Sequence, residues 1–246
     1  MIKIVLIVFV LISACKLQAQ ETLKVAFGNR LAPWVIPETD NGIIKDIITD
    51  ALEPLDYKIE AEYLPYARRL KAFNSGLVDV VSDINLNTIE NERLKGFFSG
   101  YVYQYENYAF SLSKRNYQFN AIADLVDLRL LSWQGAIAHL GDEYADMATN
   151  NPLYSETHDQ SAQVKLLFLE RVDVVQLDLQ IFNHYLAQEV KKGNIDTSAE
   201  VSKFALFGSS PNGYLFRDEN VRDEFMKRLN EMRLNGRVEE IIDSYK

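Results

Sequence analysis

Residues Glu62–Asn85 read Glu-Tyr-Leu-Pro-Tyr-Ala-Arg-Arg-Leu-Lys-Ala-Phe-Asn-Ser-Gly-Leu-Val-Asp-Val-Val-Ser-Asp-Ile-Asn, and they predict the end of one strand, a short helix and a second strand. Pro65 ends the first strand, because a proline cannot donate a hydrogen bond to a sheet ladder. The apolar residues that follow fall at helical spacing, and Gly76 is the kind of residue that stands just past a helix C-terminus. Leu77–Val81 is a short apolar run rich in valine, which is typical of a buried parallel strand.

The segments around this stretch predict a parallel sheet with helical crossovers. Leu23–Phe27 and Tyr57–Leu64 are short alternating runs that indicate strands. Between them, Asn41–Leu52 carries apolar residues at helical spacing. The order strand, helix, strand, helix, strand is typical of an α/β fold. Asp83 and Asn85 follow the predicted third strand at its carboxyl end, where open α/β sheets bind small ligands.

Composition and charge limit the functions to consider. The chain has 246 residues, enough for one large domain or two modest lobes, and a formal net charge of -9. Nucleic acid is not an expected partner, because binding it needs a basic surface. The single cysteine excludes an internal disulfide and a cysteine-rich zinc site. The histidines show no metal-ligand spacing, and no nucleophile or phosphate-binding motif occurs, so we predict no catalytic residue, metal or cofactor.

Met1–Gln20 predicts a secretory signal that is not part of the fold. Its apolar run, Ile4–Ile12, is too short to cross a bilayer comfortably, and small residues follow it. Cleavage after Ala19 is one expectation. The other is lipidation at Cys15, because Ile-Ser-Ala-Cys resembles a bacterial lipobox. Both alternatives predict an exported protein whose only cysteine lies outside the folded part.

The rest of the chain predicts a second α/β unit and a return to the first. Strands are expected at Asn107–Ser113, Arg129–Trp133 and Ser202–Phe207, with helices at about 137–149 and from Leu179 to Tyr185. Gly208–Gly213 is a turn cluster, and Tyr214–Arg217 predicts a strand that returns to the first unit.

Together these motifs resemble the family 3 extracellular solute-binding proteins, the amino-acid-binding type of periplasmic receptor. In the first half the resemblance rests on Leu70, Phe73, Gly76, Asp79, Val80 and Val81, followed by Phe98-Ser99-Gly100-Tyr101. In the second half it rests on Glu170–Asp178, where the spacing between Asp173 and Asp178 agrees with the family pattern. A closing pattern from Leu229 to Tyr245 also agrees. The resemblance therefore covers nearly the whole chain after the signal.

This resemblance implies a two-lobed periplasmic-binding-protein fold of type II. Each lobe would be a mixed sheet flanked by helices, and two hinge crossings would join them. Residues 21–113 and 214–246 would form lobe 1, and residues 114–213 would form lobe 2. A polar ligand would bind between the lobes and be enclosed by hinge closure.

The resemblance also implies the residues that would contact the ligand. Trp34 and Tyr66 would stack on it, and Asp83 is a weaker acidic candidate. Packing of Trp34 onto the core is the alternative for that residue. An arginine, either Arg68 or Arg93, would hold a carboxylate of the ligand. The backbone N–H of Gly135 would bind an anionic group, and Asp178 would pair with an ammonium group. For Asp178 the alternative is a cap on the following helix.

The predicted function is capture of an amino acid or similar zwitterion, for transport by an ABC-type permease. We expect a monomer in the periplasm, and lipidation at Cys15, where it is the outcome rather than cleavage after Ala19, would be its only membrane attachment. Two alternatives stay open at this point. One is an enzyme of the same fold that resembles the periplasmic cyclohexadienyl dehydratases, and the other is a ligand sensor that acts on a membrane receptor.

Overall fold

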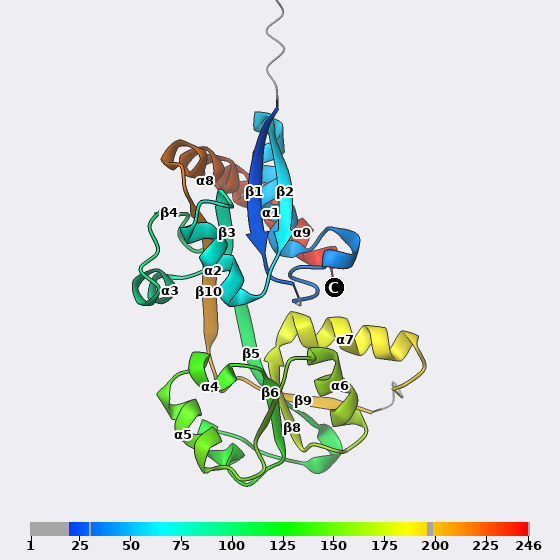
Figure 1. The fold of residues 1–246 in the computed structure, drawn as a ribbon. Helices are drawn as coiled ribbons and strands as arrows, with labels where there is room; N and C mark the ends of the chain where they lie inside the picture. Colours follow the sequence, from blue (N-terminus) through cyan, green and yellow to red (C-terminus); the bar gives the residue numbers. More distant parts are fainter. Residues whose placement is uncertain (1–19, 30, 196–198, 246) are drawn as a thin grey trace, which may run out of the picture.

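The described residues form two lobes joined by extended strands (Figure 1). The structure is a computed structural model that describes residues 20–29, 31–195 and 199–245. The predicted signal peptide, apart from Gln20, and the lipobox cysteine Cys15 lie outside these residues. In the part of the chain that is described, no helix has the length and apolar character needed to cross a membrane.

The first lobe is built on a mixed sheet. Strand β1 (Glu21–Phe27) lies between β2 (Tyr57–Tyr63) and β3 (Val80–Ile84) and is parallel to both. Strand β10 (Ser209–Phe216) joins the sheet antiparallel to β3, and the short β4 (Phe97–Phe98) pairs with β10. The predicted order of strands and helices in the first half is therefore confirmed.

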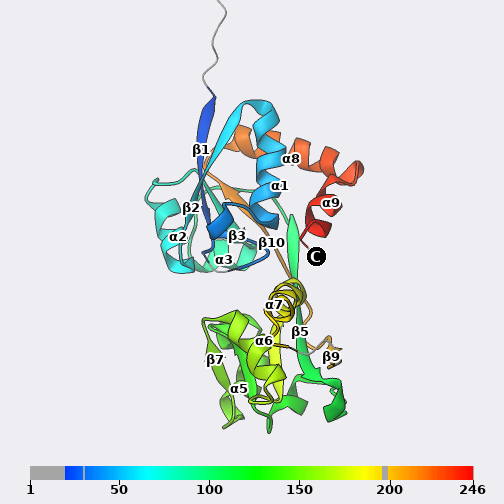
Figure 2. The same cartoon turned by 90° about the vertical axis from the view of Figure 1, so that its right-hand side faces the viewer.

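Helices cover the sheet of the first lobe: α1 (Ile43–Leu52), α2 (Tyr66–Asn74), α3 (Leu86–Asn91), α8 (Glu219–Leu234) and α9 (Arg237–Asp243). Helix α1 packs against α8 and α9, whereas α2 contacts β1 and β3 (Figure 2). The apolar stripe predicted for α1 is buried along its whole length, at Ile43, Ile44, Ile47, Ile48, Ala51 and Leu52. Because each large aliphatic side chain contributes about 1.5–3 kcal/mol when fully buried, this stripe anchors the lobe.

The second lobe has a second mixed sheet. Strand β6 (Leu130–Trp133) lies between β7 (Ser155–Thr157) and β8 (Val174–Asp178), parallel to both. Strand β5 (Tyr103–Leu112) runs antiparallel to β8, and β9 (Val201–Phe204) pairs with the other edge of β5. The helices of this lobe are α4 (Ala136–His139), α5 (Asp142–Asn150), α6 (Gln160–Phe168) and α7 (Leu179–Lys191). Short 3-10 helices occupy Pro37–Thr39, Glu53–Leu55, Ser113–Arg115 and Ile122–Leu125.

Strands β5 and β10 connect the lobes. Residues Ser209–Asn212 of β10 pair antiparallel with Tyr103–Glu106 of β5. Beyond this paired segment, β10 continues along β3 in the first lobe, and β5 continues along β8 in the second. Figures 1 and 2 show both strands spanning the gap between the lobes. The division into residues 21–113 with 214–246, and 114–213, stays a prediction.

Several elements differ from the sequence prediction. Ser209–Asn212, predicted as part of a turn cluster, belong to β10 and pair with β5, and α7 extends to Lys191, beyond the predicted end at Tyr185. The third strand was expected at Leu77–Val81 but lies at Val80–Ile84, because Leu77 is exposed and the Asp79 carboxylate accepts a hydrogen bond from the Lys24 backbone N–H. Asp83 is consequently inside the strand rather than beyond it. The helix expected over residues 137–149 is divided between α4 and α5 by Gly141, which has a φ of 91°.

Candidate functional site

A cleft of about 720 Å³ lies between the two lobes, and residues from both line it. The first lobe contributes Asn29, Tyr66, Arg69, Asp83, Thr88 and Glu92. The second contributes Trp133, Gln134, His139, Thr157, Gln160 and Asp178, and the connecting strands add Tyr105, Asn107, Ser210 and Asn212. Its volume is in the range of small-molecule sites, and its lining is rich in amide, hydroxyl and charged side chains.

A buried ion pair forms part of the first lobe's wall. The Arg69 guanidinium donates from Nη1 to Asp83 Oδ2 at 2.6 Å, and both residues are less than 9% exposed. The same nitrogen also donates to the Ser82 carbonyl at 3.0 Å. A buried charge persists only when it is paired and hydrogen-bonded, so this pair fixes both side chains at the edge of the cleft.

Two tyrosines complete the surroundings of Asp83. The hydroxyls of Tyr103 and Tyr105 donate to Asp83 Oδ1 at 3.1 and 2.5 Å. Burial, followed by the neighbouring Asp83 carboxylate, raises the pKa of both tyrosines well above the usual value, so the hydroxyls stay protonated as donors. Asp83 has a φ of 59°, a conformation that aspartate adopts more readily than most residues. Both carboxylate oxygens therefore have partners within the protein.

Asp178 ends β8 and caps α7. Its Oδ1 accepts hydrogen bonds from the backbone N–H groups of Gln180 and Ile181 and from Trp34 Nε1, the last at 2.8 Å. Its Oδ2 accepts from the Glu106 backbone N–H at 2.8 Å. Burial raises the pKa of Asp178 to about 6, although these donors lower it. The helix cap considered from the sequence is present, and the bond to Trp34 connects the two lobes.

Comparison with solved structures now identifies the fold. No protein-family model matches the sequence, and no curated protein matches it. The ligand-binding core of GluR0 in complex with L-glutamate aligns with a TM-score of 0.71 at 14% identity, covering 91% of this chain and 97% of that one. An ancestral arginine-binding protein bound to arginine aligns with a TM-score of 0.68 at 20% identity, over 92% and 99% of the two chains. A histidine kinase sensor domain with similarity to periplasmic binding proteins aligns at 0.67 and 18% identity, over 92% and 96%.

The chain has the periplasmic-binding-protein fold. This confirms the predicted two-lobed α/β architecture. It also agrees with the resemblance to family 3 solute-binding proteins that was based on sequence motifs. At these identities the likeness shows the fold alone.

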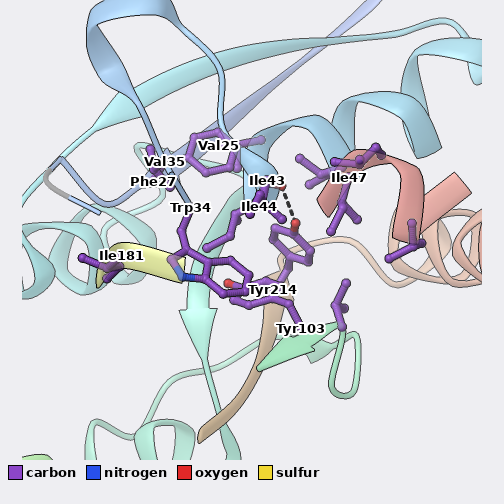
Figure 3. Packing of buried hydrophobic residues seen from close by; sticks show 14 of the residues in the cluster. Val25, Phe27, Trp34, Val35, Ile43, Ile44, Ile47, Tyr103, Ile181 and Tyr214 are labelled. Atoms are coloured by element: carbon purple, nitrogen blue, oxygen red, sulfur yellow. Dashed lines mark hydrogen bonds between the residues drawn. The ribbon is translucent and has the colours of Figure 1, made fainter. Parts of the chain in front are cut away.

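The two aromatic residues predicted to stack on a ligand lie in different surroundings within the binding-protein fold. Trp34 is 3% exposed, is not among the residues that line the cleft, and packs near Tyr103, Tyr214 and Ile181 (Figure 3). The alternative of core packing therefore describes its position. Tyr66 lines the cleft, is 38% exposed, and faces His139 of the second lobe with ring centroids 6.0 Å apart.

The arginines predicted to hold a carboxylate are not at the cleft wall. Arg68 and Arg93 are exposed, and neither lines the cleft, so their ligand contacts stay predictions. The arginine that lines the cleft is Arg69, which the sequence interpretation did not consider. A signal for it was available: Arg69 precedes Ala72 and Phe73 by one helical turn, and all three are buried on the same face of α2. Charged residues are so rarely buried that the spacing alone did not reveal it.

The backbone of Gly135 already has an anionic partner. Its N–H donates to Glu156 Oε2 at 2.8 Å, and the Ile137 N–H donates to Oε1 at 3.2 Å. The Tyr154 hydroxyl also donates to Oε1. Burial raises the pKa of Glu156, but these donors outweigh it and hold the pKa below the usual value. The Gly135 backbone N–H therefore already has an anionic partner within the protein, and a ligand contact there stays a prediction.

The described residues offer no cluster suited to a metal ion. No group of three or more histidine, cysteine, aspartate or glutamate side chains with that geometry occurs among them. The predicted absence of metal, cofactor and catalytic residue stays a prediction.

Proposed function

We propose that the protein is an exported solute-binding protein that captures a small polar solute between its lobes, with an amino acid or related zwitterion as the first class to test. The observation that carries the proposal is the cleft of about 720 Å³, which both lobes line and which two extended strands border. A ligand that contacts both walls stabilises the closed arrangement of the lobes, because it binds that arrangement better than the open one.

The lining of the cleft supports a polar ligand. Amide and hydroxyl groups come from both lobes, and charged groups come from helix α2 (Arg69) and from strands β3 (Asp83) and β8 (Asp178). Tyr66 and Trp133 add aromatic surface on opposite sides of the cleft. Such surfaces bind the apolar part of a zwitterion while polar groups orient its charged ends.

The amino-acid class is supported by two solved structures of the same fold. The GluR0 core was solved with L-glutamate, and the ancestral protein with arginine. Delivery to an ABC-type permease from the periplasm is the role that we propose, with Cys15 or the residue after Ala19 as the mature N-terminus. The formal charge of -9 is consistent with a soluble carrier.

A sensory role is the second candidate. A histidine kinase sensor domain shares the fold over 92% of this chain, so the same closure could signal ligand occupancy to a membrane receptor. Co-purification of the lipidated or mature chain with its membrane partner separates the two roles: an ATPase-linked permease supports uptake, and a kinase supports sensing. An enzyme that resembles the cyclohexadienyl dehydratases is tested by incubation with prephenate.

Thermal unfolding of residues 21–246 tests the proposal. A solute that binds only the folded state raises the melting temperature by an amount that grows with its concentration. We expect at least one of the common L-amino acids to do so, together with a decrease in the radius of gyration by small-angle X-ray scattering. If amino acids, short peptides and organic acids all leave both quantities unchanged, the proposed function is wrong.

A further inference from the structure

A second, smaller hollow, which we call the outer pocket, adjoins the cleft on the first lobe. It has a volume of about 280 Å³ and is lined by Tyr66, Ala67, Leu70, Lys71, Asn74 and Glu92. Tyr66 and Glu92 also line the cleft, so the two cavities meet at these side chains. Helices α2 and α3 lie on the side of the first lobe that faces the second (Figures 1 and 2). A ligand too long for the cleft alone therefore has a continuous path into the outer pocket.

Tyr66 is held at the junction of the two cavities by contacts on several sides. Its ring lies over the Arg69 guanidinium, with the centroid 5.3 Å from Cζ. Its hydroxyl is 3.3 Å from Thr88 Oγ1, and its ring faces His139 of the second lobe with centroids 6.0 Å apart. These contacts fix the position of the ring, so the passage beside it is defined before a ligand binds.

Charged groups differ between the cleft and the outer pocket. In the cleft, Arg69 and Asp83 form the buried ion pair, and Asp178 accepts hydrogen bonds from four N–H donors. In the outer pocket, Lys71 and Glu92 are exposed, and within the described part of the chain their side chains form no ion pair or hydrogen bond. An ionised end of a ligand therefore finds an uncommitted counter-charge at the outer pocket.

Side-chain amides line the cleft on both lobes and on the connecting strands: Asn29, Asn85, Asn107, Gln134, Gln160 and Asn212. Each carries N–H donors and a carbonyl acceptor, the same two kinds of group that a peptide bond presents. A free amino acid has no peptide bond with which to use them. The cleft volume of about 720 Å³ also lies within the range of about 300–1,000 Å³ that holds drug-sized ligands, which are larger than a free amino acid.

We propose that the solute is a short peptide, a di- or tripeptide with neutral side chains, whose N-terminal ammonium group pairs with Glu92 at the outer pocket. Its peptide groups pair with the side-chain amides of the cleft, and its length carries one end past Tyr66. Glu92 is assigned to the ligand rather than Lys71 because Glu92 lines both cavities, whereas Lys71 lines the outer pocket alone. The inference rests on the proposed function and narrows its zwitterions to peptides.

Isothermal titration calorimetry on residues 21–246 tests the ligand class with L-alanine, dialanine and trialanine, and with the matching serine series. One hydrogen bond to a peptide group changes Kd roughly 2- to 10-fold. Since each added residue brings a donor and an acceptor, we expect at least one tripeptide to bind 10-fold or more tightly than its free amino acid. This comparison needs no variant, so it does not depend on the folding of a mutant.

The ammonium contact is tested by combining E92Q with N-acetylation of the best-bound peptide. An exposed ion pair changes Kd roughly 2- to 5-fold, so E92Q should weaken binding of the unmodified peptide by that factor. Acetylation should weaken binding to the wild type more than binding to E92Q, because the variant has already lost the charge that the ammonium contacts. The matched control E90Q, an exposed glutamate of α3 that lines neither cavity, should bind both peptides like the wild type.

The outcomes separate this inference from the proposed function. If an amino acid binds the wild type and no peptide of the two series binds more tightly, the inference falls and the proposed function stands. The same holds if E92Q binds the peptides like E90Q, or if acetylation has equal effects on E92Q and the wild type. If neither these peptides nor the solutes of the thermal-unfolding test bind, both fall.

Discussion

Replacing Asp83 by asparagine tests how much the buried ion pair contributes to stability. The side chain keeps its size, and asparagine tolerates the φ of 59° as aspartate does. The change leaves the Arg69 charge buried at 4% exposure, facing a neutral amide where the Asp83 carboxylate oxygen Oδ2 accepted at 2.6 Å. Breaking one side of a buried pair costs about 3–5 kcal/mol. For a chain of this size that lowers the melting temperature by about 6–20 °C.

Urea unfolding at pH 7 measures this loss, and the two tryptophans allow it to be assigned to a lobe. Trp34 lies in the first lobe and Trp133 in the second. In a W133F background, Trp34 fluorescence reports on the first lobe, and circular dichroism reports on the whole chain. The double variant R69M/D83N should be more stable than D83N alone, because it no longer leaves a charge unpaired. A loss below about 1 kcal/mol for D83N would refute the reasoning, since it would mean that Arg69 is solvated rather than buried.

Three further predictions concern the contacts in and around the cleft. The pKa of Asp178 is raised to about 6 from an ordinary 3.8, so the folded state binds the proton more tightly. This group's contribution to stability therefore falls by about 3 kcal/mol as pH rises from about 3 to about 7. D178N should flatten that part of the pH profile of urea unfolding, and an unchanged profile would contradict the assignment. W34F removes the Nε1–H donor at 2.8 Å and should raise the pKa of Asp178 further, which an NMR titration of the carboxylate would detect or exclude. E156Q removes the charged acceptor of the Gly135 N–H and should lower the free energy of unfolding in urea by about 1–3 kcal/mol. The control E143Q, at an exposed position, should lower it by less than about 0.5 kcal/mol. Equal losses for the two variants would show that the contact contributes nothing to stability.

The fold was predictable because its elements carry local signals. The stripe from Ile43 to Leu52 has helical spacing and is buried as predicted, and the helix ending near Gly76 lies where its C-terminal signal puts it. Both signals depend on residues within one or two turns of each other. The third strand was displaced because Leu77 is exposed and Asp79 bonds to the Lys24 backbone, which is a contact between distant parts of the chain.

The site was less predictable because its charges are matched over long distances in the sequence. Arg69 in α2 forms an ion pair with Asp83 in β3, and its spacing from Ala72 and Phe73 is a weak local signal because charged residues are rarely buried. Glu156 reaches Gly135 from the neighbouring strand, so the free backbone N–H inferred at Gly135 was already bonded. Trp34 and Asp178, each predicted as a ligand contact, are hydrogen-bonded to one another, and their contacts with a ligand stay predictions. A motif gives the position of a polar group, but its partner depends on the tertiary structure.

These internal contacts change what recognition in the cleft requires. A carboxylate or guanidinium that already has partners does not need a ligand to satisfy it, and its fixed position lowers the entropy cost of binding. Selectivity then depends on the few atoms that remain unpaired, because leaving them unpaired in the closed state costs about 1–3 kcal/mol each. A solute that pairs with such atoms on both walls favours the closed arrangement. A solute that pairs with atoms of a single wall leaves the others unpaired, and so binds the open and closed arrangements with less difference.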